Sequence, residues 1–207
     1  MYLSRVAIDS KKHETMSALY NLERLHGMIE NSFSGERQRN LWRIDQLYGK
    51  DYLLLLSPVP PQNSILPAQI GFSGESWETK DYEKLLARIK EGSKWRFRLT
   101  ANPTVAKAEE KGERGTVKAI TVVPKQREWL INQSIKKGFQ LRDMQFDVVR
   151  SEWKVFKKGS RENRILAVTY EGILTVSDAE LFRQTLQIGI GREKAYGMGL
   201  ITVVSDV

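Results

Sequence analysis

The order of strand-like and helix-like patterns constrains the fold of this chain more than any other feature of its sequence. The first half carries an apolar strand pattern, a helical pattern, two further strand patterns and a second helical pattern. These segments cover residues 2–8, 12–31, 41–45, 52–57 and 81–90. The helices are predicted from apolar residues spaced three and four apart, and the strands from short apolar runs. Residues 57–67 hold four of the six prolines and predict a loop.

The second half repeats this order of elements. Residues Lys94–Thr100 alternate between apolar and polar side chains, as in a strand with one buried face. A polar loop at 102–115 and a helix at 125–137 follow, and Gly138 is placed to end that helix. A long hairpin, another helix and a last strand then cover residues 146–156, 164–176, 178–188 and 200–204.

The two patterns meet near residues 91–93. A chain of 207 residues is long enough for two small domains of about a hundred residues each. The sequence therefore predicts an α+β fold of two tandem ferredoxin-like (RRM-like, βαββαβ) domains, at residues 1–91 and 92–207.

Composition excludes several kinds of chemistry. The chain has no cysteine, which excludes disulfides, thiolate zinc sites and a cysteine nucleophile. No apolar run approaches the roughly 20 residues that span a bilayer, and the first ten residues lack the layout of a signal peptide. We therefore expect a cytoplasmic protein with no membrane partner. The net charge of +8 favours a polyanion, and residues 150–164 hold six basic side chains against two acidic ones.

Four glycines mark the most distinctive segment of the chain, residues 189–200. They are Gly189, Gly191, Gly197 and Gly199, and the basic residues between them are Arg192 and Lys194. A dinucleotide-binding loop follows a strand and opens a helix, whereas this segment follows a helix and opens a strand, which excludes that motif. Two interpretations remain. The glycines supply positive φ for a tight connection, or they let backbone amides approach a phosphate backbone while the two cations add charge.

The glycine pattern and three further motifs resemble a known family. The segment is similar to the glycine-rich loop of the repeat-associated RNA-binding superfamily found in CRISPR systems. The motifs are Met1-Tyr2-Leu3-Ser4-Arg5, Phe97-Arg98-Leu99-Thr100-Ala101-Asn102-Pro103 and Tyr170-Glu171-Gly172-Ile173-Leu174. In this order they resemble the CasE family, the repeat-processing endoribonucleases of type I-E Cascade complexes.

The resemblance implies two ferredoxin-like domains and a metal-independent endoribonuclease that needs no cofactor. Such an enzyme would cleave precursor CRISPR RNA at the base of the repeat hairpin by attack of a 2′-OH. The products would carry a 5′-OH and a 2′,3′-cyclic phosphate or 3′-phosphate, and the protein would stay bound to its hairpin beside other Cascade subunits. The alternatives are a non-catalytic subunit that binds the RNA hairpin and a general basic RNA-binding module.

His26 is the candidate catalytic group. The chain has two histidines, and His13 lies in a charged segment at the start of the predicted helix. Spacing alone places His26 at the apolar stripe of that helix, which favours a core histidine. The resemblance implies instead that His26 is the catalytic histidine of the family. An imidazole titrates close to neutrality, so it can accept the 2′-OH proton or protonate the leaving oxygen.

The partner of His26 is less clearly marked. Some family members place a tyrosine three residues before the histidine, where this chain has Glu23. Tyr20 lies six residues before His26, and a continuous helix would turn it about 120° away. Tyr20 is therefore a candidate catalytic residue with core packing as its alternative. The candidate charge-stabilising residues, each also explained as a solvated side chain, are Arg24, Arg37 and Arg39.

The basic hairpin is the main predicted RNA contact besides the glycine-rich segment. Its basic residues are Lys154, Lys157, Lys158, Arg161 and Arg164. The resemblance implies contact with an RNA stem, and a solvated turn is the alternative. Arg98 matches a family arginine and is also predicted to bind RNA, although Thr100 stands where relatives often have a second one. Asp143 and Asp147 could face one another, but no third ligand pattern accompanies them, so no metal site is predicted.

Overall fold

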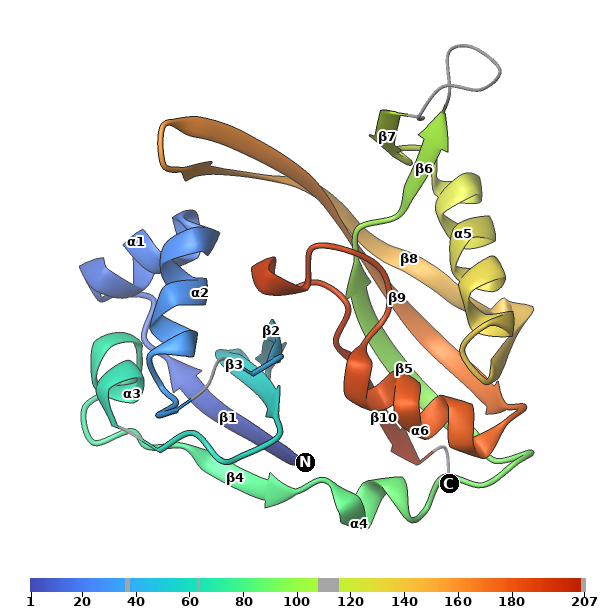
Figure 1. The fold of residues 1–207 in the computed structure, drawn as a ribbon, viewed down its shortest axis with the longest axis horizontal. Coiled ribbons are helices and arrows are strands. Elements are labelled where there is room, and N and C mark those ends of the chain that lie inside the picture. Colours follow the sequence, from blue (N-terminus) through green and yellow to red (C-terminus); the bar gives the residue numbers. More distant parts are fainter. Residues whose placement is uncertain (36–37, 63, 108–115, 206–207) are drawn as a thin grey trace.

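A computed structural model describes residues 1–35, 38–62, 64–107 and 116–205. It contains two four-stranded antiparallel sheets and a small two-stranded sheet (Figure 1). Within these ranges, none of the helices combines the length and apolar character needed to cross a bilayer.

The first sheet has the strand order β2-β3-β1-β4. Its strands are β1 (Tyr2–Ile8), β2 (Leu41–Leu47), β3 (Lys50–Ser57) and β4 (Glu78–Asp81). The helices of this half are α1 (His13–Tyr20), α2 (Leu22–Glu30), α3 (Ile65–Ile70) and α4 (Glu83–Leu86). The order places the first and third strands at the centre, as in a βαββαβ unit.

The second sheet has the order β10-β5-β9-β8, which is the same arrangement. Its strands are β5 (Lys94–Ala101), β8 (Phe139–Lys158), β9 (Arg161–Val176) and β10 (Ile201–Ser205). The remaining elements are β6 (Thr104–Lys107), β7 (Thr116–Ala119), α5 (Val123–Ile135), α6 (Ala179–Ile188) and a 3-10 turn, η1 (Lys194–Tyr196). The predicted α+β class is therefore confirmed.

Several element predictions were wrong. The helix expected over residues 12–31 is two helices, because the Asn21 backbone is extended and its side-chain oxygen caps α2 by accepting from the Glu23 and Arg24 amides. The helix expected over 81–90 is shorter in the structure, where α4 covers Glu83–Leu86 and follows the strand β4 (Glu78–Asp81). The loop expected over 57–67 ends where α3 begins at Ile65.

The loop expected over 102–115 was also wrong in part. Residues 104–107 form β6, which pairs with β7 in the two-stranded sheet, and residues 108–115 lie outside the described ranges. The two hairpin strands are longer than predicted, because β8 begins at Phe139 and β9 at Arg161. Two register shifts in their pairing, between Leu141 and Phe146 and between Val148 and Arg150, mark irregularities in β8.

The hydrophobic cores of the two halves are shared across the sheets. The larger cluster surrounds β5 and β9 and includes Leu41 and Leu56 of the first sheet. The smaller cluster surrounds α2 and includes Phe156 and Ile165 from the β8–β9 hairpin. Figure 1 shows this hairpin reaching from the second sheet toward α1 and α2. Burial of hairpin side chains against α2 therefore helps to place the two sheets relative to one another.

Arg43 on β2 joins the two sheets through buried polar contacts. Its side chain is 3% exposed and forms an ion pair with Asp45 at 2.6 Å. The same guanidinium donates to the carbonyl oxygens of Arg98 at 2.9 Å and Leu200 at 2.7 Å, and to the Thr202 hydroxyl at 2.7 Å. One first-sheet side chain thus satisfies acceptors on both β5 and the start of β10.

Replacing Arg43 with methionine should lower the free energy of unfolding by about 3–5 kcal/mol, because the buried Asp45 carboxylate loses its main partner. Urea denaturation measures the change. Arg5→Met is the matched control, since the Arg5–Glu78 pair is about half exposed and should contribute less than about 1 kcal/mol. Equal losses in the two variants would contradict a special role for Arg43.

Candidate active site

His26 lies half-buried on α2, at the edge of the helix face that packs into the core. Leu22, Leu25 and Ile29 form the buried face of α2. His26 lines two neighbouring cavities, of about 540 and 460 Å³, which share Glu30 and two further lining residues, Gln38 and Asn40. The imidazole is therefore accessible from a concave surface, which a histidine buried only for packing would not be.

The larger of these cavities brings the glycine-rich segment to His26. Its far wall runs from Gly191 to Ala195, and its cationic lining residues are Arg39, Arg192 and Lys194. Glu30 and Glu193 also line it, so the cavity is not uniformly positive. The structure thus places four predicted site residues, His26, Gly191, Arg192 and Lys194, around one space, together with the candidate Arg39. Arg37 lies outside the described ranges.

Gly189 and Gly197 lie so close to neighbouring atoms that a side chain would not fit at either position. A Cβ atom on Gly197 would lie 2.7 Å from the Trp42 ring, and one on Gly189 would lie 2.7 Å from the Gly199 carbonyl oxygen. Both glycines have positive φ, 81° and 74°. The Gly189, Gly197 and Gly199 amides donate to carbonyl oxygens of Thr185, Lys194 and Thr100. The conformational interpretation therefore holds at these positions, and phosphate contact at them stays a prediction.

Lys194 lies in an unusual electrostatic environment. Its side chain is half-buried beside His26, and burial lowers its pKa below the ordinary lysine range. The positive charges of Arg39 and Lys137 lower the pKa of Lys194 further. A perturbed lysine in a cavity beside a histidine is a candidate functional group, because an arriving anion would relieve this electrostatic cost.

Tyr196 is the tyrosine nearest His26 in the structure, and the sequence analysis missed it. The two rings meet edge-on, with centroids 6.4 Å apart. The Tyr196 hydroxyl donates to the Glu23 carboxylate at 2.8 Å and accepts from the Lys158 ammonium at 3.1 Å. Burial raises the pKa of the Tyr196 hydroxyl. The only sequence signal was its place two residues after Lys194 in the glycine-rich segment.

Tyr20 lies at the end of α1 with 75% of its surface exposed. It lines a different cavity from the two that His26 lines, together with Met16, Leu19 and Trp153. The predicted angle of about 120° between Tyr20 and His26 assumes one continuous helix. The helix breaks at Asn21, so that angle does not apply. The core-packing alternative is wrong for a side chain this exposed, and the catalytic role stays a prediction.

The predicted RNA-binding residues of the β8–β9 hairpin fall into two groups. Lys157 and Arg161 are exposed beside the turn. The other basic side chains have partners: Lys154 pairs with Glu152, Lys158 with Tyr196 and Glu23, and Arg164 lies over the Trp153 ring at 5.3 Å.

Arg98 and the aspartate pair have structural partners. The Arg98 guanidinium lies 3.5 Å from Asp45 and 3.2 Å from Glu171, which attaches it to the network around Arg43. Asp143 and Asp147 both bind Arg127, at 2.6 and 2.8 Å. Across the described part of the chain, no group of three or more acidic or histidine side chains is placed to hold a metal ion.

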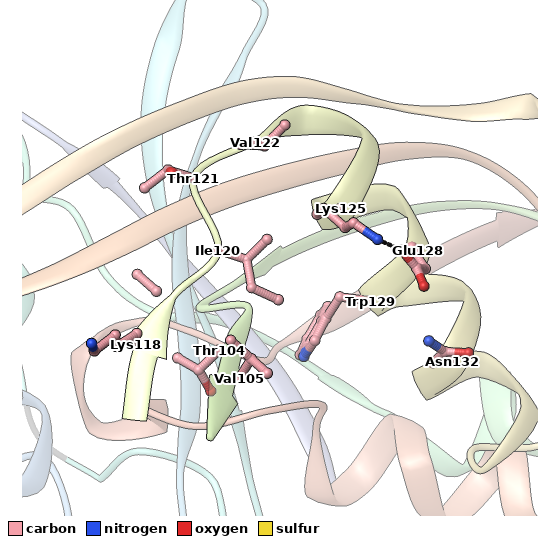
Figure 2. Close-up of a pocket in the computed structure, with 11 residues that line it drawn as sticks. Thr104, Val105, Lys118, Ile120, Thr121, Val122, Lys125, Glu128, Trp129 and Asn132 are labelled. Atoms are coloured by element: carbon pink, nitrogen blue, oxygen red, sulfur yellow. Dashed lines mark hydrogen bonds and ion pairs between the residues drawn. The ribbon is translucent and has the colours of Figure 1, made fainter. Parts of the chain in front are cut away.

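Another cavity, of about 590 Å³, lies away from His26 between α5 and the β6–β7 hairpin. Figure 2 shows Trp129 and Ile120 pointing into it, with the Lys125–Glu128 pair at its edge. Its lining offers no histidine and is mainly apolar. The His26 cavity is the stronger candidate for catalysis, because it combines a proton-transfer group with cations that can stabilise developing negative charge.

The sequence of this chain is similar to those of known proteins along nearly its whole length. Residues 1–204 match the protein family described as CRISPR associated protein. The chain is 26% identical over 223 aligned residues to the CRISPR-associated endoribonuclease Cse3 of Thermus thermophilus, covering 98% of this chain and 99% of that protein. The resemblance drawn from the sequence motifs is therefore confirmed.

Solved structures share the fold along the whole chain. One is Thermus thermophilus Cse3 bound to an RNA representing a pre-cleavage complex, with a TM-score of 0.81, 24% identity and 98% of each chain covered. Another is a chain of a CRISPR RNA-guided surveillance complex before nicking, with a TM-score of 0.75, 22% identity, and 99% of this chain and 100% of that chain covered.

Replacing Tyr196 with phenylalanine should lower the free energy of unfolding by about 1–2 kcal/mol, because the Glu23 carboxylate loses a hydrogen bond while ring packing on Phe156 is kept. Urea denaturation gives the value. Tyr20→Phe is the control and should change stability by less than about 0.5 kcal/mol, since that side chain is exposed. A similar small change in both variants would show that the Tyr196 hydroxyl does not stabilise the site.

Proposed function

Because this chain belongs to the family of CRISPR associated proteins, we propose that it is an endoribonuclease that cleaves precursor CRISPR RNA at the base of the repeat hairpin. The observation that carries the proposal is the cavity in which His26, Lys194 and Arg192 meet. We also propose that the product hairpin stays bound and that the complex joins a Cascade assembly, in line with the shared fold of the surveillance-complex chain. Residues 1–91 and 92–207 would be its two domains.

Cleavage would use the RNA's own 2′-OH as the nucleophile, so the protein need only align the phosphate and move protons. His26 would accept the 2′-OH proton or protonate the 5′-oxygen leaving group, a contribution of about 10²–10⁴-fold. Lys194 and Arg192 would stabilise the charge that develops on the phosphate oxygens. This route requires no metal, and the products are a 5′-OH and a 2′,3′-cyclic phosphate or its opened 3′-phosphate.

Tyr196 would hold the catalytic imidazole in place. The chain has Glu23 where some relatives have a tyrosine, and Glu23 instead accepts a hydrogen bond from Tyr196. The Tyr196 ring packs edge-on against His26, while Lys158 ties the same hydroxyl to the basic hairpin. An RNA stem that contacts Lys157 and Arg161 at the end of the hairpin would therefore bind close to the catalytic cavity.

His26→Ala should abolish cleavage of a labelled repeat-hairpin RNA in EDTA and leave RNA affinity nearly unchanged, because the imidazole acts in proton transfer rather than in charge neutralisation. His13→Ala, the only other histidine variant, is the matched control and should cleave like the wild type. End analysis of the wild-type products should find the cyclic phosphate or 3′-phosphate. Tight binding without cleavage by the wild type would favour the non-catalytic RNA-binding alternative.

RNA affinity should fall with rising pH in part through Lys194. Burial and neighbouring cations lower the pKa of Lys194 in the free protein, and a bound phosphate would raise it. Binding then takes up a proton at pH values between the free-state and bound-state pKa, so affinity decreases as the pH rises through that interval.

Lys194→Arg keeps its charge across this range, so its affinity should depend less on pH. Fluorescence anisotropy in the His26→Ala background, from neutral pH to about pH 9.5, compares the two slopes without cleavage. Equal slopes with lysine and arginine would exclude Lys194 from the phosphate site.

A further inference from the structure

A third cavity, of about 230 Å³, adjoins the catalytic one. Its walls come from the start of β6, from β7, from β9 and from the glycine-rich segment. The two cavities share Arg192 and Glu193, and the third cavity adds Asn102, Thr104 and Arg164. Its volume lies below the roughly 300–1,000 Å³ of cavities for drug-sized ligands, and it therefore suits one small planar ring system.

Asn102 is the most informative side chain in this cavity. Its relative exposure is 6%, and its Oδ1 atom has no hydrogen-bond partner within the described chain. A buried acceptor without a partner destabilises a protein, so such an atom calls for an explanation by function. A ligand that presents an N–H group to the Asn102 amide, turned about its Cβ–Cγ bond toward the cavity, would satisfy it.

Glu193 provides a second acceptor in the same cavity. It has φ of 59°, a left-handed conformation that a residue with a side chain seldom adopts. Backbone strain of this kind concentrates at functional sites, where it aims a particular side chain. The Glu193 carboxylate and the Asn102 amide oxygen are both hydrogen-bond acceptors, so the cavity suits a ligand with N–H donors.

Two arginines complete the lining. Arg192 is exposed at the cavity wall, and the Arg164 guanidinium lies over the Trp153 ring at 5.3 Å, a stacked position that leaves its N–H edge able to donate to a ligand. Guanine matches this combination of groups best. Its N1–H and N2–H₂ donors suit Asn102 and Glu193, and its O6 and N7 acceptors suit an arginine.

We propose that this cavity binds a single unpaired guanine base of the RNA, next to the phosphate that is cleaved. The proposal rests on the proposed function and deepens it. Because Arg192 lines both cavities, a base held in one fixes the position of the backbone in the other. The cavity would thus set which phosphate lies beside His26.

The test replaces each unpaired guanosine of the repeat RNA in turn with inosine, which lacks the N2 amine. Dissociation constants are measured in the His26→Ala background, and cleavage positions with wild-type His26. At one position, inosine should weaken binding about 10-fold when Asn102 is present. In the Asn102→Ala variant, guanosine and inosine at that position should bind equally. Asn132→Ala, whose residue lines the separate apolar cavity, is the matched control and should keep the 10-fold difference.

Folding is checked by thermal denaturation, and Asn102→Ala should not lower the Tm, since the atom it removes is unsatisfied. Glu193→Gln is the second variant and should also reduce the difference between guanosine and inosine. Tight binding and normal cleavage with no inosine-sensitive position would overturn the guanine site alone. Failure of the wild type to bind or cut the repeat RNA would overturn the proposed function and this inference together.

Discussion

The Arg43 guanidinium is the contact on which the rest of the structure depends. It lies buried on β2, pairs with Asp45, and donates to carbonyl groups on β5 and just before β10. Since β10 directly follows the glycine-rich segment, these bonds determine where that segment runs. The neighbouring Trp42 indole adds a hydrogen bond to the Ala195 carbonyl at 3.1 Å. Trp42 and Arg43 therefore hold the glycine-rich segment against the first sheet. Burying the Arg43 charge is unfavourable, and the Asp45 carboxylate and the carbonyl groups that accept from Arg43 offset this unfavourable free energy.

The cavity beside His26 is a consequence of this docking. His26 comes from a helix of the first half, whereas Arg192 and Lys194 come from the far end of the chain. The chain of hydrogen bonds from Lys158 through Tyr196 to Glu23 adds the β8–β9 hairpin to the same assembly. Three segments distant in sequence thus converge on one imidazole. Burial and the positive charges of Arg39 and Lys137 lower the pKa of Lys194, and a bound phosphate would offset this electrostatic cost.

The glycine-rich segment serves two neighbouring cavities with one short stretch of backbone. Gly189 and Gly197 have no Cβ atom, and this allows the backbone to pack closely against its neighbours. Glu193, with its left-handed backbone, lies between the two cationic residues Arg192 and Lys194. Arg192 lines both cavities, so a base proposed to bind beside Asn102 and a phosphate proposed to bind beside His26 would both contact it. These cavities contain both carboxylates and cations, whereas a uniformly basic surface would contact phosphates without regard to the RNA sequence.

The sequence by itself determined the order of elements, the buried face of β5 and the need for glycine in the 189–199 turn, because these follow from local periodicity and backbone sterics. Periodicity alone favoured a core position for His26, and only the family resemblance made it the catalytic candidate. It did not determine the break at Asn21, where a capping side chain outweighs the apolar spacing that spans residues 12–31. Only the tertiary structure decided that Tyr196, 170 residues after His26 in the chain, contacts it, and that Asn102 is buried without a partner. Contacts between distant segments depend on how two sheets dock, and docking depends on side-chain complementarity that no local pattern records.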